Sequence, residues 1–191
     1  WIGLVGSEMC IRDSIYNDHS NKADRENILE QLKLGLSAGI ISDAGTPLIS
    51  DPGYKLISKL IVNNINIIPL PGPTAVIPAL TGSGLPTSKF QFNGFLPKKK
   101  KELVNMLNEC SNYRGTTVFY ETPHRLIASL ELIDQIFGST AHICVAKELT
   151  KLHESFFRGT AKEVLDKFSA KKELIKGCLL YTSDAADERL S

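Results

Sequence analysis

The sequence predicts an α/β layered fold, and three observations predict it. Amphipathic segments with helical spacing alternate along the chain with short apolar segments. The apolar segments end in turns rich in glycine and proline, as at residues 43–47 and 71–73. One of them, residues 65–70, is apolar without alternation, which is typical of a strand covered on both faces in a parallel sheet.

The first half of the chain is expected to alternate helices with strands. A helix is predicted over residues 21–37, and the apolar residues that recur on its face are Ile28, Leu29, Leu32 and Leu36. A short buried strand is predicted over residues 40–43. A second helix follows to about Asn63, with Asp51 at its cap and Pro52 at its first position. The strand at 65–70 then leads through a turn into another short helix.

The pattern changes after residues 82–86, and a domain boundary is predicted near Ser88. Alternating phenylalanines at 90, 92 and 95 indicate a strand with one solvated face. The elements expected after it are a helix from the lysine run at 98–101 to Cys110, a strand at 116–120, a helix at 123–137 and a strand at 143–147. A last helix begins at Thr160, where Glu163 completes a capping box.

The two ends of the chain do not continue these patterns. Residues 1–14 and 178–191 lack sustained periodicity and resemble translated adapter sequence, so they are set aside as non-native-looking tails. The predicted organisation is therefore a partial N-terminal α/β domain at 15–88 and a partial C-terminal α/β domain at 89–177. An N-terminal strand and the C-terminal strands are expected to be missing.

Composition excludes several classes of protein. The chain has 191 residues, 42% of them hydrophobic and 23% charged, which is ordinary for a globular protein and excludes overall disorder. No apolar run approaches the roughly 20 residues of a membrane span. The four cysteines have neither metal-binding nor disulfide-scaffold spacing, so a reducing, cytoplasmic setting without a metal is expected. Residues 15–177 carry 20 basic and 16 acidic residues, a mildly basic balance that permits a polyanionic partner.

The chemistry is expected at the ends of the predicted strands. In open α/β sheets, ligands bind beyond the carboxyl ends of strands, which makes the turns at 43–47 and 71–73 candidate ligand loops; the alternative is that they are only tight turns. No phosphate-loop, dinucleotide, zinc-protease or serine-hydrolase motif occurs. Titratable residues follow two other strands, at Glu121, His124 and Arg125 and at 147–154, where surface ion pairs and caps are the alternative.

Several motifs occur in one order and carry a resemblance to a known family. They are SDAGTPLISDPGY at 42–54, PLPGPTA at 69–75, SGLPT at 83–87, FNGFLP at 92–97, YETPHRL at 120–126 and KELTKLHE at 147–154. Over residues 15–177 the chain resembles the ribosomal RNA small subunit methyltransferase I family of the tetrapyrrole methylase superfamily. The resemblance implies two α/β domains with a cofactor cleft between them. It also implies an S-adenosylmethionine-dependent enzyme that methylates the ribose 2′-hydroxyl of a cytidine in the decoding region of 16S rRNA.

The resemblance also implies roles for individual residues. The cofactor would be bound by Asp43, Ala44, Gly45, Thr46, Ile49, Pro71, Gly72, Thr74 and Ala75, with Phe119 and Tyr120 near its adenine. RNA would be bound by Lys98, Lys99, Lys100, Lys101, His124, Arg125, Lys147 and Lys151. A base that accepts the hydroxyl proton could be Glu148, Glu121 or His153. The expected partners are the small ribosomal subunit and a second copy of the chain in a homodimer.

The chain departs from the family pattern at both ends, and two other readings stay open. The turn with which family members begin, Thr-Pro-Ile-Gly-Asn-Leu, has no counterpart in residues 1–14, and the family pattern ends after Gly177. One alternative is a methylase of corrin-type tetrapyrroles. The other is a truncated, inactive fragment that binds RNA.

Overall fold

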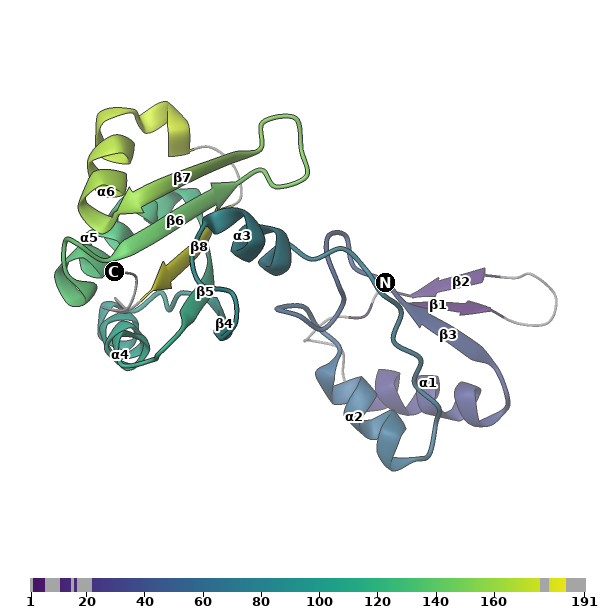
Figure 1. The fold of residues 1–191 in the computed structure, drawn as a ribbon. Helices are drawn as coiled ribbons and strands as arrows, with labels where there is room; N and C mark the ends of the chain where they lie inside the picture. The colour runs from purple at the N-terminus through teal and green to yellow at the C-terminus, as the bar shows by residue number, and fades with distance from the viewer. Residues whose placement is uncertain (1, 6–10, 15, 17–21, 176–178, 185–191) are drawn as a thin grey trace. The chain divides into compact units, whose positions relative to one another are not determined.

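A computed structural model describes residues 2–5, 11–14, 16, 22–175 and 179–184 (Figure 1). The chain divides into two compact units, residues 1–74 and 75–191. The division falls earlier than the boundary predicted near Ser88. The reason is that α3 (Val76–Ser83) packs its Val76, Ala79 and Leu80 against the sheet of the second unit.

The first unit combines a small antiparallel sheet with two helices. Its strands β1 (Ile2–Val5), β2 (Ile11–Ser14) and β3 (Ser37–Ile40) lie in the order β2-β1-β3. The helices are α1 (Lys22–Lys33) and α2 (Tyr54–Val62). Their buried contacts are made by Ile28 and Leu29 of α1 with Leu56 and Leu60 of α2. An ion pair between Glu26 and Lys59 links the same two helices.

Three predictions for the strands and for α1 of this unit are wrong. The strand lies at Ser37–Ile40 rather than at 40–43, and α1 ends at Lys33 because Gly35, at a φ of 89°, turns the chain into β3. Residues 65–70 form no strand. Ile65 and Ile67 pack against the two helices, whereas Ile68 and Leu70 are exposed. The segment is therefore covered on one face, not two.

The second unit contains a five-stranded sheet in the order β4-β5-β8-β6-β7. The strands are β4 (Phe90–Phe95), β5 (Thr116–Glu121), β6 (His142–Lys147), β7 (Ser155–Thr160) and β8 (Leu179–Asp184). β4 is parallel to β5, while β8 is antiparallel to both β5 and β6. The carboxyl ends of β4, β5 and β6 consequently lie at one edge of the sheet, as predicted for the candidate site.

Helices cover both faces of this sheet (Figure 1). On one face pack α4 (Lys100–Ser111), α5 (Leu126–Phe137) and α6 (Ala161–Ala170), which bury Phe119 and Val145. On the other face lies α3, against Val118 and Ala146. Because neighbouring residues of a strand point to opposite faces, β5 and β6 contribute to both cores. This is the α/β layering that the sequence predicts.

The prediction that both ends of the chain lack strands is wrong for the described residues. Residues 2–5, 11–14 and 179–184 are all paired in sheets. β5 and β6 run parallel to each other and are separated by the width of one strand. Without β8 between them, each would expose a row of unpaired N–H and C=O groups. Residues 179–184 carry apolar, aromatic and β-branched residues that suit a strand, so they fill this gap. The antiparallel strand β7 was also not anticipated.

The capping box of α6 was predicted correctly, whereas the cap predicted at Asp51 is wrong, because α2 begins at Tyr54 with Gly53 before it and no side-chain cap. Thr160 caps α6, with its side chain accepting a hydrogen bond from the Glu163 N–H (3.2 Å) and Glu163 accepting one from the Thr160 N–H (2.8 Å). Within the described ranges, none of the helices has the length and apolarity needed to cross a bilayer.

Gly82→Ala is expected to lower the free energy of unfolding by about 1–3 kcal/mol, although alanine is the better helix former. A Cβ at position 82 would lie within 3.0 Å of the Phe156 ring. That ring is held in place by the Arg158 guanidinium, 4.7 Å from the ring centroid, which also donates to the Gly82 carbonyl. Urea unfolding followed by circular dichroism measures the effect.

The matched control is Thr81→Ala, because Thr81 is exposed on the same helix and donates only to carbonyls of its own turn. Its unfolding free energy is expected to change by no more than about 0.5 kcal/mol. A Gly82→Ala protein that is more stable than the parent would contradict the packing argument.

Candidate functional site

The first candidate ligand loops, residues 43–47 and 71–73, meet in the first unit. The Thr46 hydroxyl donates a 2.7 Å hydrogen bond to the Pro73 carbonyl, across 27 residues of sequence. Within the first loop, the Ser42 hydroxyl donates to the Gly45 carbonyl at 3.0 Å. The structure therefore brings together the two turns that the sequence singled out separately.

The backbone of the first loop is unusual. Left-handed φ angles occur at Gly45 (80°) and Gly53 (138°), and also at the non-glycine residues Leu48 (72°) and Ser50 (60°). Non-glycine residues rarely adopt this conformation, and it concentrates at ligand sites. A hydrogen-bonded neighbouring turn is one of the restraints that hold such a loop in place.

Small residues keep the backbone of both loops accessible. A Cβ on Gly72 would lie 3.5 Å from Thr46 Oγ1, and one on Gly45 would lie 3.9 Å from the Pro73 carbonyl. Asp43, Ala44 and Pro71 are exposed, and Ile49 is half exposed. The arrangement offers a carboxylate, a hydroxyl and bare backbone to one ligand, with an apolar side chain nearby.

Two further predicted cofactor residues lie at the junction of the units. Thr74 is the last residue of the first unit, and Ala75 directly precedes α3. Ala75 packs against the cluster formed by Val118 and Ala146. The predicted cleft between the domains stays a prediction.

Phe119 and Tyr120, the aromatic residues predicted near the adenine, are neighbours on β5 and therefore point to opposite faces of the sheet. Phe119 is fully buried in the core beneath α4 and α5, so its predicted place beside the adenine is wrong. Tyr120 points to the opposite face, where its ring lies 4.8 Å from that of Phe92 and 5.3 Å from that of Phe95. Phe95 is half exposed. An aromatic surface on this face is thus built from Tyr120 and its neighbours rather than from Phe119.

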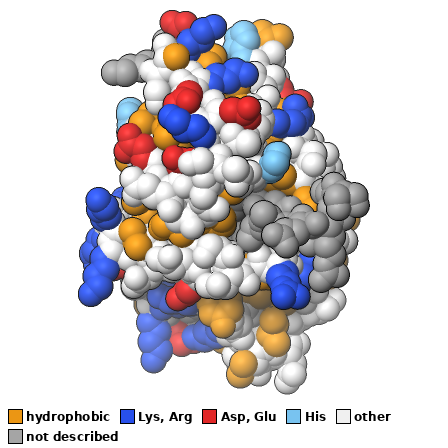
Figure 2. Space-filling view, turned by 60° about the vertical axis from the view of Figure 1, so that its left-hand side comes forward, with side chains coloured by type: hydrophobic (Ala, Val, Ile, Leu, Met, Phe, Trp, Pro, Cys, Tyr) orange, Lys and Arg blue, Asp and Glu red, His pale blue; other side chains and the backbone are white. Residues whose placement is uncertain are grey.

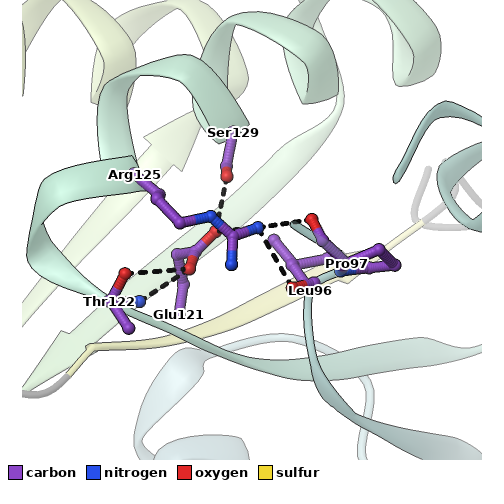
Figure 3. A network of polar contacts seen from close by, with 6 residues as sticks. All are labelled: Leu96, Pro97, Glu121, Thr122, Arg125 and Ser129. Atoms are coloured by element: carbon purple, nitrogen blue, oxygen red, sulfur yellow. Dashed lines mark hydrogen bonds and ion pairs between the residues drawn. The ribbon is translucent and has the colours of Figure 1, made fainter. Parts of the chain in front are cut away.

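Glu121, a predicted base, is the centre of a buried polar network (Figure 3). The residue is 1% exposed. Its carboxylate accepts hydrogen bonds from the Thr122 N–H (2.7 Å) and the Ser129 hydroxyl (2.6 Å). Arg125 Nη2 lies 3.3 Å from the same carboxylate. Because both carboxylate oxygens already bind protein groups, the geometry assigns Glu121 a structural role and contradicts its prediction as a base.

Arg125 is held by the same network. Its Nη2 also donates to the carbonyls of Leu96 (3.0 Å) and Pro97 (2.5 Å), which follow β4. As Figure 3 shows, the guanidinium bridges the end of β4 and the start of α5. Arg125 therefore fixes two adjacent strand ends through Nη2, and its role as an RNA contact stays a prediction. Ser129, which the sequence reasoning missed, lies one helical turn beyond Arg125, a spacing that could have indicated it.

Lys147 is also engaged within the fold. Its ammonium donates a 2.8 Å hydrogen bond to the Leu174 carbonyl. Lys147 and Glu121 are both paired with Leu179 of β8, from opposite sides. Two strand spacings of about 4.8 Å separate the two backbones, so the predicted strand-end residues do share one edge.

The loop between β6 and β7 carries the other two candidate bases. Glu148 and Thr150 have left-handed φ angles of 51° and 64°. The Lys151 ammonium lies 3.3 Å from Glu148 Oε1, whereas His153 is exposed. The Thr150 N–H donates to Glu154 Oε2 at 2.7 Å. The loop is thus internally hydrogen-bonded and presents Glu148 and His153 at the same edge.

The remaining predicted RNA residues are exposed at the surface. Residues 98–101 precede or open α4, and Lys99 forms an exposed ion pair with Glu102 at 3.0 Å. His124 is exposed beyond the end of β5. Acidic and basic side chains are intermingled in the upper part of the face drawn in Figure 2. On α6, Lys162 and Asp166 form an exposed ion pair at 2.6 Å.

Metal-ligating side chains and the thiol of Cys110 can be placed in the part of the chain that the structure describes. No group of three or more potential ligand side chains comes together there. Burial raises the pKa of the Cys110 thiol, which the hydrogen bond from Asn93 (3.2 Å) only partly opposes. Cys110 is therefore a protonated core residue at neutral pH.

Comparison with known proteins decides the family. The family model for Tetrapyrrole (Corrin/Porphyrin) Methylases matches residues 6–165. The chain belongs to the tetrapyrrole methylase family. The predicted tetrapyrrole-methylase-like fold is thereby confirmed. Among solved structures, the methyltransferase CobJ has a TM-score of 0.62 at 19% identity, covering 91% of this chain and 76% of its own.

Relatives within the methylase family narrow the assignment. Proteins named ribosomal RNA small subunit methyltransferase I include that of Rickettsia prowazekii, 45% identical over 85% of this chain and 57% of the relative. That of Synechocystis is 38% identical over 92% and 63%, and that of Thermotoga maritima is 40% identical over 83% and 71%. This confirms the resemblance to the methyltransferase I branch. The chain spans 57% and 63% of the length of the first two relatives.

Proposed function

We propose that this chain is the S-adenosylmethionine-binding part of a methyltransferase that transfers a methyl group to a cytidine ribose 2′-hydroxyl of 16S rRNA. The relatives' name, ribosomal RNA small subunit methyltransferase I, supports small-subunit ribosomal RNA as the substrate. The cytidine 2′-hydroxyl is what the family resemblance implies. The observation that carries the cofactor site is the Thr46–Pro73 hydrogen bond, which unites two ligand loops. The proposal includes a cytoplasmic homodimer that acts on the small ribosomal subunit.

The residues present fit such a cofactor. Gly45 and Gly72 leave the backbone open where a Cβ would narrow the approach. The exposed carboxylate of Asp43 suits an ammonium or hydroxyl group, and Ile49 offers apolar contact to a base or methylene chain. A solved uroporphyrin-III C-methyl transferase from Thermus thermophilus complexed with S-adenyl homocysteine shares the fold, with a TM-score of 0.53 at 11% identity.

The protein's contribution to the reaction is mainly positioning. S-adenosylmethionine supplies a methyl group on a positively charged sulfur, and its transfer is an in-line displacement that needs the acceptor oxygen at near-attack distance. The hydrogen bond from Thr46 to the Pro73 carbonyl restrains the cofactor loop, including its left-handed residues Leu48 and Ser50, before the acceptor arrives. A base then accepts the proton of the ribose hydroxyl.

Among the three predicted bases, Glu148 and His153 remain part of the proposal. Both lie in the loop after β6, and His153 is exposed to solvent. The Lys151 ammonium forms an ion pair with Glu148 Oε1 at 3.3 Å. Lys151, His124 and residues 98–101 are proposed to contact RNA phosphates.

Titration with S-adenosylhomocysteine followed by methyl transfer to small ribosomal subunits tests the proposal. Calorimetry is expected to show one site per chain, and labelled methyl groups are expected in 16S rRNA but not in a tetrapyrrole acceptor. Transfer to the tetrapyrrole alone would favour the corrin-type alternative. RNA binding without cofactor binding would instead indicate an inactive RNA-binding fragment.

A further inference from the structure

A cavity of about 370 Å³ lies in the first unit, lined by Tyr16, Arg25, Asp51, Gly53, Tyr54 and Lys55. None of these residues belongs to the predicted cofactor, RNA or catalytic sets. The volume falls within the range of small-molecule sites, which begins at about 300 Å³. The lining residues come from α1, from α2, from the turn that precedes α2 and, for Tyr16, from the chain before α1, so the fold gathers them from separate parts of the unit.

Two cationic side chains line the cavity. Arg25 projects from α1 and is half-buried, whereas Lys55 stands in the first turn of α2 and is exposed. The residue before α2 is Gly53, which has no side chain with which to cap the helix. Helix N-termini carry partial positive charge, so it adds to the field of the two cations. Together these groups favour an anionic ligand of phosphate type.

Two aromatic rings also line the cavity and could stack against a planar group of a ligand. Tyr16 and Tyr54 line it, and Tyr54 is 75% exposed. Exposed aromatic rings beside basic side chains are the usual platform for unstacked nucleic-acid bases. The Asp51 carboxylate lies in the same wall and accepts hydrogen bonds from amino or hydroxyl groups while repelling a second phosphate. One phosphate, one base and one sugar therefore match the lining better than an inorganic polyanion does.

The cavity adjoins the proposed cofactor loop. Asp51 and Gly53 continue the loop that holds Gly45 and Thr46, and a Cβ on Gly53 would lie 3.1 Å from Leu48 Cγ. Leu48 thus packs directly behind the cavity wall. A ligand in the cavity would be placed beside the loop from which the methyl group is proposed to be delivered.

We infer that this cavity binds one nucleotide of a single-stranded RNA segment, with its phosphate at Arg25 and Lys55 and its base against Tyr54. The inference rests on the proposed function for its RNA substrate. It adds a contact in the first unit to the RNA residues proposed above, all of which lie in the second.

Fluorescence anisotropy with a labelled ten-nucleotide single-stranded RNA tests the inference on the full chain. Tyr54→Ala is expected to weaken binding about ten-fold or more, since stacking of a base is lost, and Tyr54→Phe is expected to bind within two-fold of the parent. Lys55→Ala is expected to reduce the slope of log affinity against log salt by about 0.7, as for one phosphate of a single strand. Lys33→Ala, an exposed lysine of α1 outside the cavity, is the charge-matched control and is expected to change affinity far less.

The inference would be overturned by unchanged RNA affinity in both Tyr54→Ala and Lys55→Ala, or by equal losses in Lys55→Ala and Lys33→Ala. Both cavity residues are exposed, and circular dichroism checks that the variants fold. Titration with S-adenosylhomocysteine separates this outcome from failure of the proposed function. A chain that binds the cofactor but whose RNA affinity ignores Tyr54 retains the proposed function and loses the cavity. If the chain does not bind the cofactor but its RNA affinity depends on Tyr54, the inference about the cavity stands and the proposed function fails.

Discussion

Glu121→Ala is expected to lower the free energy of unfolding by about 3 kcal/mol, a large part of the stability of an ordinary domain. The carboxylate is buried and accepts hydrogen bonds from Ser129 (2.6 Å) and from the Thr122 N–H (2.7 Å). Its removal leaves the hydroxyl of Ser129, itself 1% exposed, without this acceptor. It also withdraws the countercharge from Arg125, whose position joins the ends of β4 and β5. Urea unfolding monitored by circular dichroism measures the loss.

Two matched variants separate the network from a general effect of losing a carboxylate. Glu131→Ala removes an exposed carboxylate from the same helix, α5, and is expected to change stability by less than about 0.5 kcal/mol. Ser129→Ala removes one charge-assisted hydrogen bond and is expected to cost about 1.5–3 kcal/mol. Equal stability of the Glu121→Ala and Glu131→Ala proteins would refute the structural role.

Glu121→Gln distinguishes a structural carboxylate from a catalytic base. Glutamine keeps the shape and most of the packing, so methyl transfer by the folded variant is expected to stay within about ten-fold of the parent. A general base contributes about 100-fold or more, so a loss of that size in a folded Glu121→Gln protein would return Glu121 to the catalytic set. The position of the proton acceptor would then move from the loop after β6 to the end of β5.

The sequence predicted best those features that depend on neighbouring residues. The capping box of Thr160 and Glu163 is satisfied within one turn of helix, and the strand at β6 and the helix at α5 carry strong local patterns. The alternation around Phe90 and Phe92 likewise marks β4. These signals need no knowledge of what packs against them.

The failures share a different cause, because they depend on partners distant in sequence. Residues 65–70 have the composition of a buried strand, but Ile65 and Ile67 pack on two helices and the segment joins no sheet. Phe119 and Tyr120 are adjacent in sequence, yet the pleat places them on opposite faces, and only the helices show which face is core. The pairing of β8 between β5 and β6 depends on an opening that composition alone does not reveal.

In the candidate site, too, local features could be predicted from the sequence, whereas contacts between distant residues could not. The loops at 43–47 and 71–73 could be predicted as ligand loops from their glycines and prolines, but not their mutual hydrogen bond, which spans 27 residues. Glu121 and Arg125 could be singled out as titratable groups at a strand end. Their hydrogen bonds, from Ser129 to Glu121 and from Arg125 to the carbonyls of Leu96 and Pro97, could be found only from the structure. The residue type shows which chemistry a side chain could perform, whereas its hydrogen-bond partners determine whether it is available for that chemistry.

Gly45→Val is expected to weaken S-adenosylhomocysteine binding about 30-fold or more while leaving the helical cores intact. Position 45 has a φ of 80°, which a β-branched residue adopts only at a cost of about 1–3 kcal/mol. The loop would escape this strain by rotating, and rotation would break the alignment of Thr46 with the Pro73 carbonyl. Calorimetric titration measures the affinity, and urea unfolding measures the stability of the same protein.

Gly39→Val is the matched control, because it makes the same chemical change in β3, where φ is not positive and no atom lies within 4 Å of the new Cβ. Its cofactor affinity is expected to equal that of the parent. If Gly45→Val also binds like the parent, the left-handed turn does not shape the cofactor site, and the Thr46–Pro73 bond serves only to fold the loop. If Gly39→Val loses affinity as well, the loss reflects the first unit as a whole. Only the combination of a strong effect at position 45 and none at position 39 assigns cofactor binding to the geometry of this loop.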